Sequence, residues 1–300
     1  MNIGLIGLGK MGSNLALNLV DHGHDVIGFD LNEIAREELS KKGISVVSTV
    51  QDLVNSLPER KVIWMMVPSG KATDDCIQEV MNLLGSNDIV IDAGNSNYKD
   101  SIRHAQILSE KGLKFLDVGT SGGTSGARHG ACLMIGGDHE AYEYLENVFM
   151  DVSIEDGCLY TGNAGSGHFM KMVHNGIEYG MMQAIGEGFQ IMRQCQFDYN
   201  LAEVAKNWNH GSVIRGWLME IAQNQFEAHP DLADIKGVVA ASGEAKWTVE
   251  TALELEVPVP VIALSLMVRN RSQEEDNYAC KVVSALRNGF GGHAVVKTEK

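Results

Sequence analysis

Four polar side chains recur at helical spacing in one segment of the chain: Lys171, His174, Asn175 and Glu178. At about 100° per residue, these positions share a stripe roughly 100° wide on one helix face. Apolar residues such as Met172 and Val173 flank the stripe, and polar groups among apolar neighbours are costly unless they are paired or functional. The pattern therefore favours a catalytic face. The alternative is a solvated face with a lysine–glutamate ion pair.

A lysine and a glutamate on one helix face can work as an acid–base pair. Burial beside a positively charged nicotinamide ring lowers the pKa of a lysine, which can then accept a hydroxyl proton near neutral pH. Two titratable groups in separate environments can divide the roles of base and acid between them. We therefore predict that Lys171 is the general base and that Glu178 donates a proton later in the reaction.

A glycine-rich turn lies near the start of the chain, where the letters GLGKMG at residues 7–12 separate a short apolar strand from a helix predicted over 11–21. This strand–turn–helix context makes a GxGxxG pattern informative for dinucleotide binding. The glycines allow a tight turn and a close approach to a pyrophosphate, and the helix N-terminus supplies free N–H groups. The alternative is a purely structural turn.

The nature of the dinucleotide is predicted from the end of the second strand. Asp30 stands there, within the roughly twenty-residue distance at which an acid binds the adenosine ribose hydroxyls. A carboxylate repels a 2′-phosphate, and the next residues, Leu31 and Asn32, include no arginine. The sequence thus predicts NAD rather than NADP as the cofactor. The alternative for Asp30 is a solvated carboxylate at a strand end.

The elements that must position these residues change in type along the chain. Up to about residue 160, short β-type runs alternate with amphipathic helical segments, which predicts an α/β N-terminal Rossmann-type domain with a doubly wound parallel sheet. Beyond Gly165 the chain is rich in Met, Ala, Glu and Gln, and long helices are predicted over 168–194 and 201–226. We therefore predict a dinucleotide-binding Rossmann domain over residues 1–163 and an all-α C-terminal substrate and oligomerisation domain over residues 164–300.

Composition excludes several classes of function. The net charge of −15 opposes binding to nucleic acid. The five cysteines form no CxxC pair, which suits a reducing compartment, and no His, Cys, Asp or Glu set has metal-ligand spacing. The first residues lead directly into a strand without a signal peptide, and the longest apolar stretch, 257–268, is too short to span a bilayer. We predict a cytoplasmic protein that binds no metal, membrane or nucleic acid.

The letters KMVHNGIEYG at residues 171–180 resemble the signature of 6-phosphogluconate dehydrogenase. The resemblance covers nearly the whole chain. Further matches are Asp92–Ser96, Ser121–Gly123, Gly126–Arg128, Ala245–Thr248, Arg269 and Arg287–His293.

The resemblance implies a reaction. It is the oxidative decarboxylation of 6-phosphogluconate to ribulose 5-phosphate and CO2, with hydride transfer to NAD, in gluconate utilisation and the pentose phosphate pathway. By position in the motif, Lys171 matches the base that takes the 3-hydroxyl proton, and Glu178 matches the acid that protonates C1 of the enediol after CO2 departs.

The turn and the resemblance together predict two sets of binding residues. Those predicted for the cofactor are Gly7, Leu8, Gly9, Lys10, Met11, Gly12, Asp30, Val67 and Asn95. Those implied for the substrate are Asn95, Ser121, Gly122, Gly123, His174, Asn175, Tyr179, Lys246, Arg269, Arg287 and His293. The resemblance assigns Tyr179, Lys246, Arg269 and Arg287 to the phosphate. In that family a neighbouring subunit supplies the tail Arg and His, so a homodimer or homotetramer is expected.

The sequence departs from the longer members of this family. Its helical region is much shorter, and Asp30-Leu31 replaces the Asn-Arg pair of the members that use NADP. One alternative is another β-hydroxyacid dehydrogenase that acts on a small unphosphorylated 3-hydroxy acid, which Glu178 and the predicted phosphate cluster oppose. Another alternative is a non-catalytic NAD(H)-binding regulatory protein, which would have no need of both Lys171 and Glu178.

Overall fold

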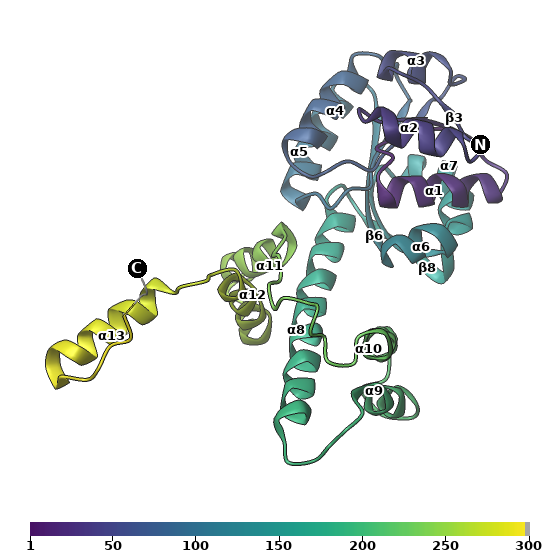
Figure 1. Cartoon of the computed structure of the whole chain (residues 1–300). Helices are drawn as coiled ribbons and strands as arrows, with labels where there is room; N and C mark the ends of the chain where they lie inside the picture. Colours follow the sequence, from purple (N-terminus) through teal and green to yellow (C-terminus); the bar gives the residue numbers. More distant parts are fainter. Residues whose placement is uncertain (298–300) are drawn as a thin grey trace. The chain divides into compact units, whose positions relative to one another are not determined.

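The computed structural model describes residues 1–297, and Figure 1 traces the chain. The first fifteen elements alternate strands and helices: β1 Asn2–Ile6, α1 Lys10–Asp21, β2 Asp25–Phe29, α2 Glu33–Ser40, β3 Ser45–Val46, α3 Val50–Asn55, β4 Val62–Met65, α4 Lys71–Met81, β5 Ile89–Asp92, α5 Tyr98–Ser109, β6 Lys114–Ser121, α6 Gly123–His129, β7 Ala131–Gly137, α7 His139–Asp151 and β8 Ser153–Gly162. Helices follow: α8 Ser166–Gln194, α9 Leu201–Asn209, α10 Trp217–Ala228, α11 Gly243–Glu254, α12 Pro260–Ser272 and α13 Tyr278–Gly291.

Within the described residues the strands form one eight-stranded sheet in the order β3-β2-β1-β4-β5-β6-β7-β8. All neighbouring pairs are parallel except β6 and β7, which are antiparallel. The predicted Rossmann-type fold with a helical C-terminal part is therefore confirmed. The strand order reverses direction between β1 and β4, and ligands of such sheets bind outside the carboxyl ends of the strands at this switch point.

Successive side chains of a strand point to opposite faces of the sheet. The apolar residues of the strands therefore contribute to two cores, one on each face. Ile3 and Leu5 pack with Trp64 and with residues of α1, α2 and α7. Ile6 and Ile63 point to the other face and pack with residues of α3, α4 and α5. Figure 1 shows these two helical layers on either side of the sheet. A sheet that is buried on both faces holds its strand ends rigidly, as a binding edge requires.

Beyond the sheet, one predicted helix is wrong. A continuous helix over 201–226 is not formed, because α9 ends at Asn209 and α10 begins at Trp217. Gly211 and Gly216 between them have φ values of +86° and +155°, which no helix accommodates. The Asn209 side chain accepts the Gly216 N–H at 2.9 Å and closes the connection. Helices α9 and α10 then pack around Phe189, Met219 and Phe226.

The chain packs as two compact units, Met1–Asn175 and the residues from Gly176 onward. This division falls inside α8, because the first turns of α8 pack on the sheet unit. A domain boundary between residues 163 and 164 stays a prediction. Among residues 1–297, no helix combines the length and apolar character needed to cross a membrane.

Candidate active site

The turn between β1 and α1 is built by glycines that tolerate no side chain. Gly7 has a φ of +94°, and a Cβ atom there would lie 2.5 Å from the Met66 carbonyl oxygen. A Cβ atom on Gly12 would lie 1.9 Å from the Gly7 carbonyl oxygen. At Gly9, by contrast, a Cβ atom would have no atom within 4 Å. The turn is tight on its inner side and open to a ligand at Gly9.

The first turn of α1 offers donors to that open side. Gly9 is the N-cap residue and has no side chain with which to cap the helix, and the first N–H groups of a helix have no partner within it. These donors and the positive end of the helix dipole suit a pyrophosphate. The geometry of Gly7, Gly9 and Gly12 therefore fits NAD.

Asp30 is held in place by backbone amides from two elements. The Leu8 N–H donates to its Oδ2 atom at 2.6 Å, and the Asn32 N–H donates to its Oδ1 atom at 2.7 Å. Each carboxylate oxygen keeps a further lone pair with which to accept a ribose hydroxyl. The arrangement directly connects the glycine turn to the end of β2.

Arg36 is a residue of this region that the sequence reasoning missed. Its Nη1 atom donates to the carbonyl oxygen of Asp30 at 2.6 Å and to that of Leu31 at 3.4 Å. The residues that directly follow Asp30, Leu31 and Asn32, are not arginines, and Arg36 lies four residues beyond Asn32. The first turn of α2 brings Arg36 back to the end of β2. A helix predicted to begin soon after Asp30 would have indicated this, because residues one turn apart lie close together.

The other predicted cofactor residues follow β4 and β5. A Cβ atom on Gly7 would lie 3.2 Å from a Val67 methyl group, and one on Gly94 would lie 2.6 Å from the Val67 carbonyl oxygen. Val67 therefore lies between the ends of β1 and β5. Asn95, the next residue after Gly94, is exposed at the same edge. The structure thus brings Val67 to the glycine turn, at the switch point of the sheet.

A cysteine near this edge has no nucleophilic role. The Cys76 Sγ atom donates to the Met65 Sδ atom at 3.3 Å. Burial, with smaller contributions from the charges of Glu79 and Asp92, raises the pKa of the Cys76 thiol to about 12. Because the thiolate is the reactive form, Cys76 stays an unreactive thiol at neutral pH.

Lys171 is buried at the sheet side of α8, with only 7% of its surface exposed. Its Nζ atom donates to the Asn175 Oδ1 atom at 2.7 Å. The same oxygen lies 3.0 Å from His174 Nδ1, and His174 Nε2 lies 3.2 Å from the Ser121 hydroxyl. Four predicted site residues, Ser121, Lys171, His174 and Asn175, therefore form one hydrogen-bonded network in the sheet unit.

The network sets the tautomer of His174. The Asn175 Oδ1 atom can only accept, so the Nδ1 atom of His174 carries the proton that it shares with Asn175. The Nε2 atom of a neutral ring is then an acceptor, and the Ser121 hydroxyl donates to it. In this state Ser121 is oriented by the helix that carries Lys171, and its oxygen lone pairs remain available to a substrate hydroxyl.

The loop after β6 carries the predicted glycines Gly122 and Gly123. Both have positive φ values, +117° and +60°. Gly122 is the N-cap of α6 and Gly123 is exposed. The structure therefore places them directly after Ser121, where backbone groups are open to a ligand.

Within the second unit, three predicted residues lie on α8, α11 and α12. The guanidinium carbon of Arg269 lies 3.4 Å from the centre of the Tyr179 ring, a cation–π arrangement. The Tyr179 hydroxyl accepts the Ser242 N–H at 3.2 Å and lies 3.1 Å from the Ser242 hydroxyl. Lys246 lies one turn beyond Ser242 on α11, exposed, with Glu250 at 3.6 Å. Tyr179 and Arg269 are therefore brought together, with Ser242 as an unpredicted partner.

Three further predicted residues of this unit lie on α8, on α13 and after α13. Glu178 precedes Tyr179 on α8 and is half-buried. Arg287 lies on α13, none of whose residues is buried, and His293 follows that helix; both are exposed. The roles of all the predicted site residues stay predictions.

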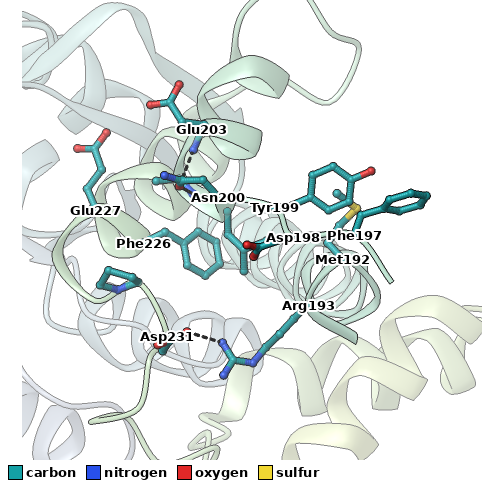
Figure 2. A pocket seen from close by; sticks show the side chains of 13 residues that line it. Met192, Arg193, Phe197, Asp198, Tyr199, Asn200, Glu203, Phe226, Glu227 and Asp231 are labelled. Carbon is teal, nitrogen blue, oxygen red and sulfur yellow. Dashed lines mark hydrogen bonds and ion pairs between the residues drawn. The ribbon is translucent and has the colours of Figure 1, made fainter. Parts of the chain in front are cut away.

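A pocket of about 760 Å³ lies elsewhere in the second unit, where the end of α8 meets α9 and α10. Figure 2 shows two interactions among its lining residues, one between Arg193 and Asp231 and one between Asn200 and Glu203. Arg193 donates to Asp231 at 3.0 Å, and Asn200 caps α9 through the N–H groups of Ala202 and Glu203. Because none of the predicted catalytic, cofactor or substrate residues lines it, we do not assign the chemistry to this pocket.

Comparison with known protein families matches both parts of the chain. Residues 2–162 match the NAD binding domain of 6-phosphogluconate dehydrogenase. Residues 167–300 match the C-terminal domain of 6-phosphogluconate dehydrogenase. The chain belongs to the 6-phosphogluconate dehydrogenase family. The resemblance found in the sequence is thereby confirmed, and so is an NAD-binding domain.

Individual relatives agree with this family. A Bacillus subtilis protein, YqeC, whose name assigns it provisionally to the 6-phosphogluconate dehydrogenases, is 52% identical over 99% of this chain and 100% of its own. The NAD(+)-dependent, decarboxylating 6-phosphogluconate dehydrogenase of Haloferax volcanii is 43% identical over the whole of both chains. The solved 6-phosphogluconate dehydrogenase of Plasmodium falciparum is 32% identical, with a TM-score of 0.85 over 100% of this chain and 67% of its own.

Proposed function

We propose that this chain catalyses the oxidative decarboxylation of 6-phosphogluconate to ribulose 5-phosphate and CO2, with NAD as the hydride acceptor. The observation that carries the proposal is the buried Lys171 in its network with Asn175, His174 and Ser121. The family and the fit of the glycine turn to NAD support it. When bound, NAD takes the hydride from C3 of the substrate. The proposal includes a cytoplasmic location and a place in the pentose phosphate pathway.

Each residue of the network has a defined task in this proposal. Lys171 accepts the 3-hydroxyl proton as the C3–H bond breaks, which yields a 3-keto acid. The bond between the carboxylate carbon and C2 then breaks, CO2 leaves, and Lys171 returns its proton to the C3 oxygen to give an enediol. Glu178 protonates C2, the carbon that lost CO2, and the C3 hydroxyl gives its proton back to Lys171 to form the ketone. Ser121 and His174 hold the substrate hydroxyls.

A turnover assay tests the function directly. Purified protein with NAD and 6-phosphogluconate should release NADH and CO2 in equal amounts. NADH formed from a small unphosphorylated 3-hydroxy acid, without CO2, would instead support the β-hydroxyacid dehydrogenase alternative. Binding of NAD without turnover of either substrate would support a regulatory protein. The buried Lys171 network disfavours the last outcome, since a sensor has no need of a proton acceptor.

Cofactor preference gives a first quantitative prediction. The kcat/KM for NAD should exceed that for NADP by at least tenfold, about 1.4 kcal/mol, because the fixed Asp30 carboxylate repels a 2′-phosphate. Steady-state kinetics at a saturating 6-phosphogluconate concentration measure the ratio. Equal efficiency with NADP would contradict the prediction.

A designed pair of changes tests the cause of that preference. Asp30→Ser combined with Leu31→Arg should shift the kcat/KM ratio toward NADP, since it removes the repelling charge and adds a cation at an exposed position. Leu31→Ala is the matched control and should leave the ratio unchanged. In the wild-type protein the Arg36 guanidinium donates to the carbonyl oxygens of Asp30 and Leu31, backbone atoms that neither variant removes.

We also propose that the tail acts on a neighbouring subunit of a homodimer or homotetramer. Along α13, Tyr278, Val283, Leu286 and Phe290 are 55–79% exposed, and an amphipathic helix with such an apolar stripe requires a partner. The family resemblance assigns Arg287 on this helix and His293 after it to the active site of the neighbour. A second copy of this chain would cover the apolar stripe of α13 and would receive Arg287 and His293 in its active site.

Mixed oligomers give the second prediction. Lys171→Met subunits and Arg287→Ala subunits, each with low activity alone, should regain activity after subunits are exchanged. The two lesions would then fall in different sites, and some sites would have Lys171 and Arg287 both intact. Activity before and after exchange measures the gain, with exchange verified by native mass spectrometry. No gain after complete exchange would mean that each chain builds its own site.

A further inference from the structure

A buried carboxylate on β6 caps the helix that carries Lys171. Asp117 has no exposed surface. Its Oδ1 atom accepts the Gly165 N–H at 2.7 Å, and its Oδ2 atom accepts the His168 N–H at 2.8 Å. Helix α8 begins between these two residues, at Ser166. Asp117 thus satisfies two N–H donors at the helix start from a different element of the fold, and its charge complements the helix dipole.

The backbone of α8 lies directly on the sheet at this point. A Cβ atom on Gly167 would lie 2.4 Å from the carbonyl oxygens of both Asp117 and Met134. A Cβ atom on Gly136, the register partner of Asp117, would lie 2.7 Å from the Gly167 amide nitrogen. The first turn of α8 therefore packs against β6 and β7 so closely that no side chain fits between them. A small shift of the helix toward the sheet would cause a steric clash with the backbone of these strands.

Alternate residues of β6 contact successive turns of α8. Asp117 holds the N–H of His168, and Ser121 contacts His174. Between them lies Gly119, where a Cβ atom would lie 2.4 Å from the Lys171 Cβ atom. Residues 117, 119 and 121 share one face of the strand, whose side chains repeat every second residue. The contacts advance by two residues on the strand and by three on the helix, so alternate strand residues meet successive turns of α8 at residues 168, 171 and 174.

A second contact fixes the same turn from the side. The His168 Nδ1 atom lies 2.7 Å from the Ser101 hydroxyl on α5. His168 is 1% exposed and Ser101 is fully buried. The turn of α8 that precedes Lys171 is therefore held by β6 through its backbone and by α5 through a side chain.

We propose that Asp117 is a positioning residue for the reaction. By anchoring the N-terminus of α8, Asp117 places Lys171 beside Gly119 and His174 beside Ser121, at the end of β6. In the proposed function the substrate hydroxyls bind there. This inference rests on the proposed function. It predicts that loss of the carboxylate lowers the rate of the chemical step, since a displacement of about 1 Å of a catalytic group can cost ~100-fold in rate. A cap with a purely structural role would affect only stability.

The test compares two buried or half-buried capping aspartates. Asp117→Asn keeps the shape of the side chain but turns an NH2 group toward one of the two N–H donors. Asp138→Asn is the matched control, because Asp138 is the N-cap of α7 and accepts the Ala141 N–H at 2.9 Å. Measurements on the full chain are Tm, the Kd for NAD, kcat and KM for 6-phosphogluconate, and hydrogen exchange of the amides of residues 165–171.

Both variants should lower Tm. Only Asp117→Asn should lower kcat, by about 10- to 100-fold, with KM changed less than about threefold and the Kd for NAD unchanged. Hydrogen exchange at residues 165–171 should be faster in that variant alone. Unchanged kcat in a folded Asp117→Asn protein, at a temperature well below its Tm, would overturn the proposal. A wild-type protein that does not oxidise 6-phosphogluconate would overturn the proposed function instead, while the exchange data would still report on the cap.

Two milder variants keep the test decisive if Asp117→Asn fails to fold. Ser101→Ala removes the contact with His168 and leaves the carboxylate in place. Gly119→Ala puts a methyl group against the Lys171 Cβ atom and the Gly167 carbonyl oxygen and leaves the Asp117 carboxylate unchanged. Each should lower kcat more than KM rises. Full kcat in both variants would show that the register between β6 and α8 does not control the chemistry.

Discussion

Replacement of Lys171 by Met should lower kcat for 6-phosphogluconate oxidation by about 10²- to 10⁴-fold, the usual contribution of a general acid or base. Methionine retains the length of the buried stem against Gly119 but cannot accept a proton. The affinity for NAD should be unchanged, because the glycine turn at residues 7–12 lies on other elements. Steady-state kinetics and a fluorescence titration with NADH measure the two effects.

A matched lysine separates this effect from a general loss of charge. Lys111→Met removes an exposed lysine whose Nζ atom donates to Asn82 on the surface at 3.1 Å, and it should leave kcat within about twofold of wild type. If Lys171→Met retains more than about a tenth of the wild-type kcat, the assignment of the base is wrong. Asn175→Ala, which removes the acceptor of the Lys171 amine, should lower kcat less than Lys171→Met does.

Replacement of Arg269 by Ala should raise the KM for 6-phosphogluconate by roughly 10- to 150-fold. A hydrogen bond to a charged group contributes ~1.5–3 kcal/mol, and here it would be lost from the substrate phosphate. The KM for NAD should stay unchanged. Unphosphorylated gluconate should be a poor substrate of the wild type, and Arg269→Ala should affect its kcat/KM far less, since it has no phosphate to lose.

The same helix provides the control for Arg269. Arg271, two residues later on α12, is exposed and donates to the Glu274 carbonyl oxygen at 3.1 Å. Arg271→Ala should leave the KM for 6-phosphogluconate within about twofold of wild type. Arg269→Lys keeps a positive charge but loses the planar stack on Tyr179, so an intermediate KM is expected. Equal losses with gluconate and 6-phosphogluconate in Arg269→Ala would show that Arg269 does not bind the phosphate.

Short-range patterns in the sequence were enough to predict the fold class, the glycine turn, the Lys171–Asn175 pair and the family. Strands that alternate with helices require a mostly parallel sheet, and the glycines of residues 7–12 require a tight turn, because both features depend on the local backbone. The pairing of Lys171 with Asn175 follows from the period of a single helix. The family signature lies in the same short segment, so the family could be identified without the fold.

Contacts between distant segments required the tertiary structure. The capping of α8 by Asp117, the approach of Ser121 to His174 and the stacking of Arg269 on Tyr179 join elements that no local period relates. The break between α9 and α10 was also missed, because composition alone does not show that Gly211 and Gly216 adopt positive φ values. The periodicity of side chains and the residue preferences of turns act over a few residues. Which strand lies beside a given helix depends instead on how the entire sheet packs. The sequence therefore predicted a set of candidate catalytic residues, and the packing of α8 on β6 decided how they are held.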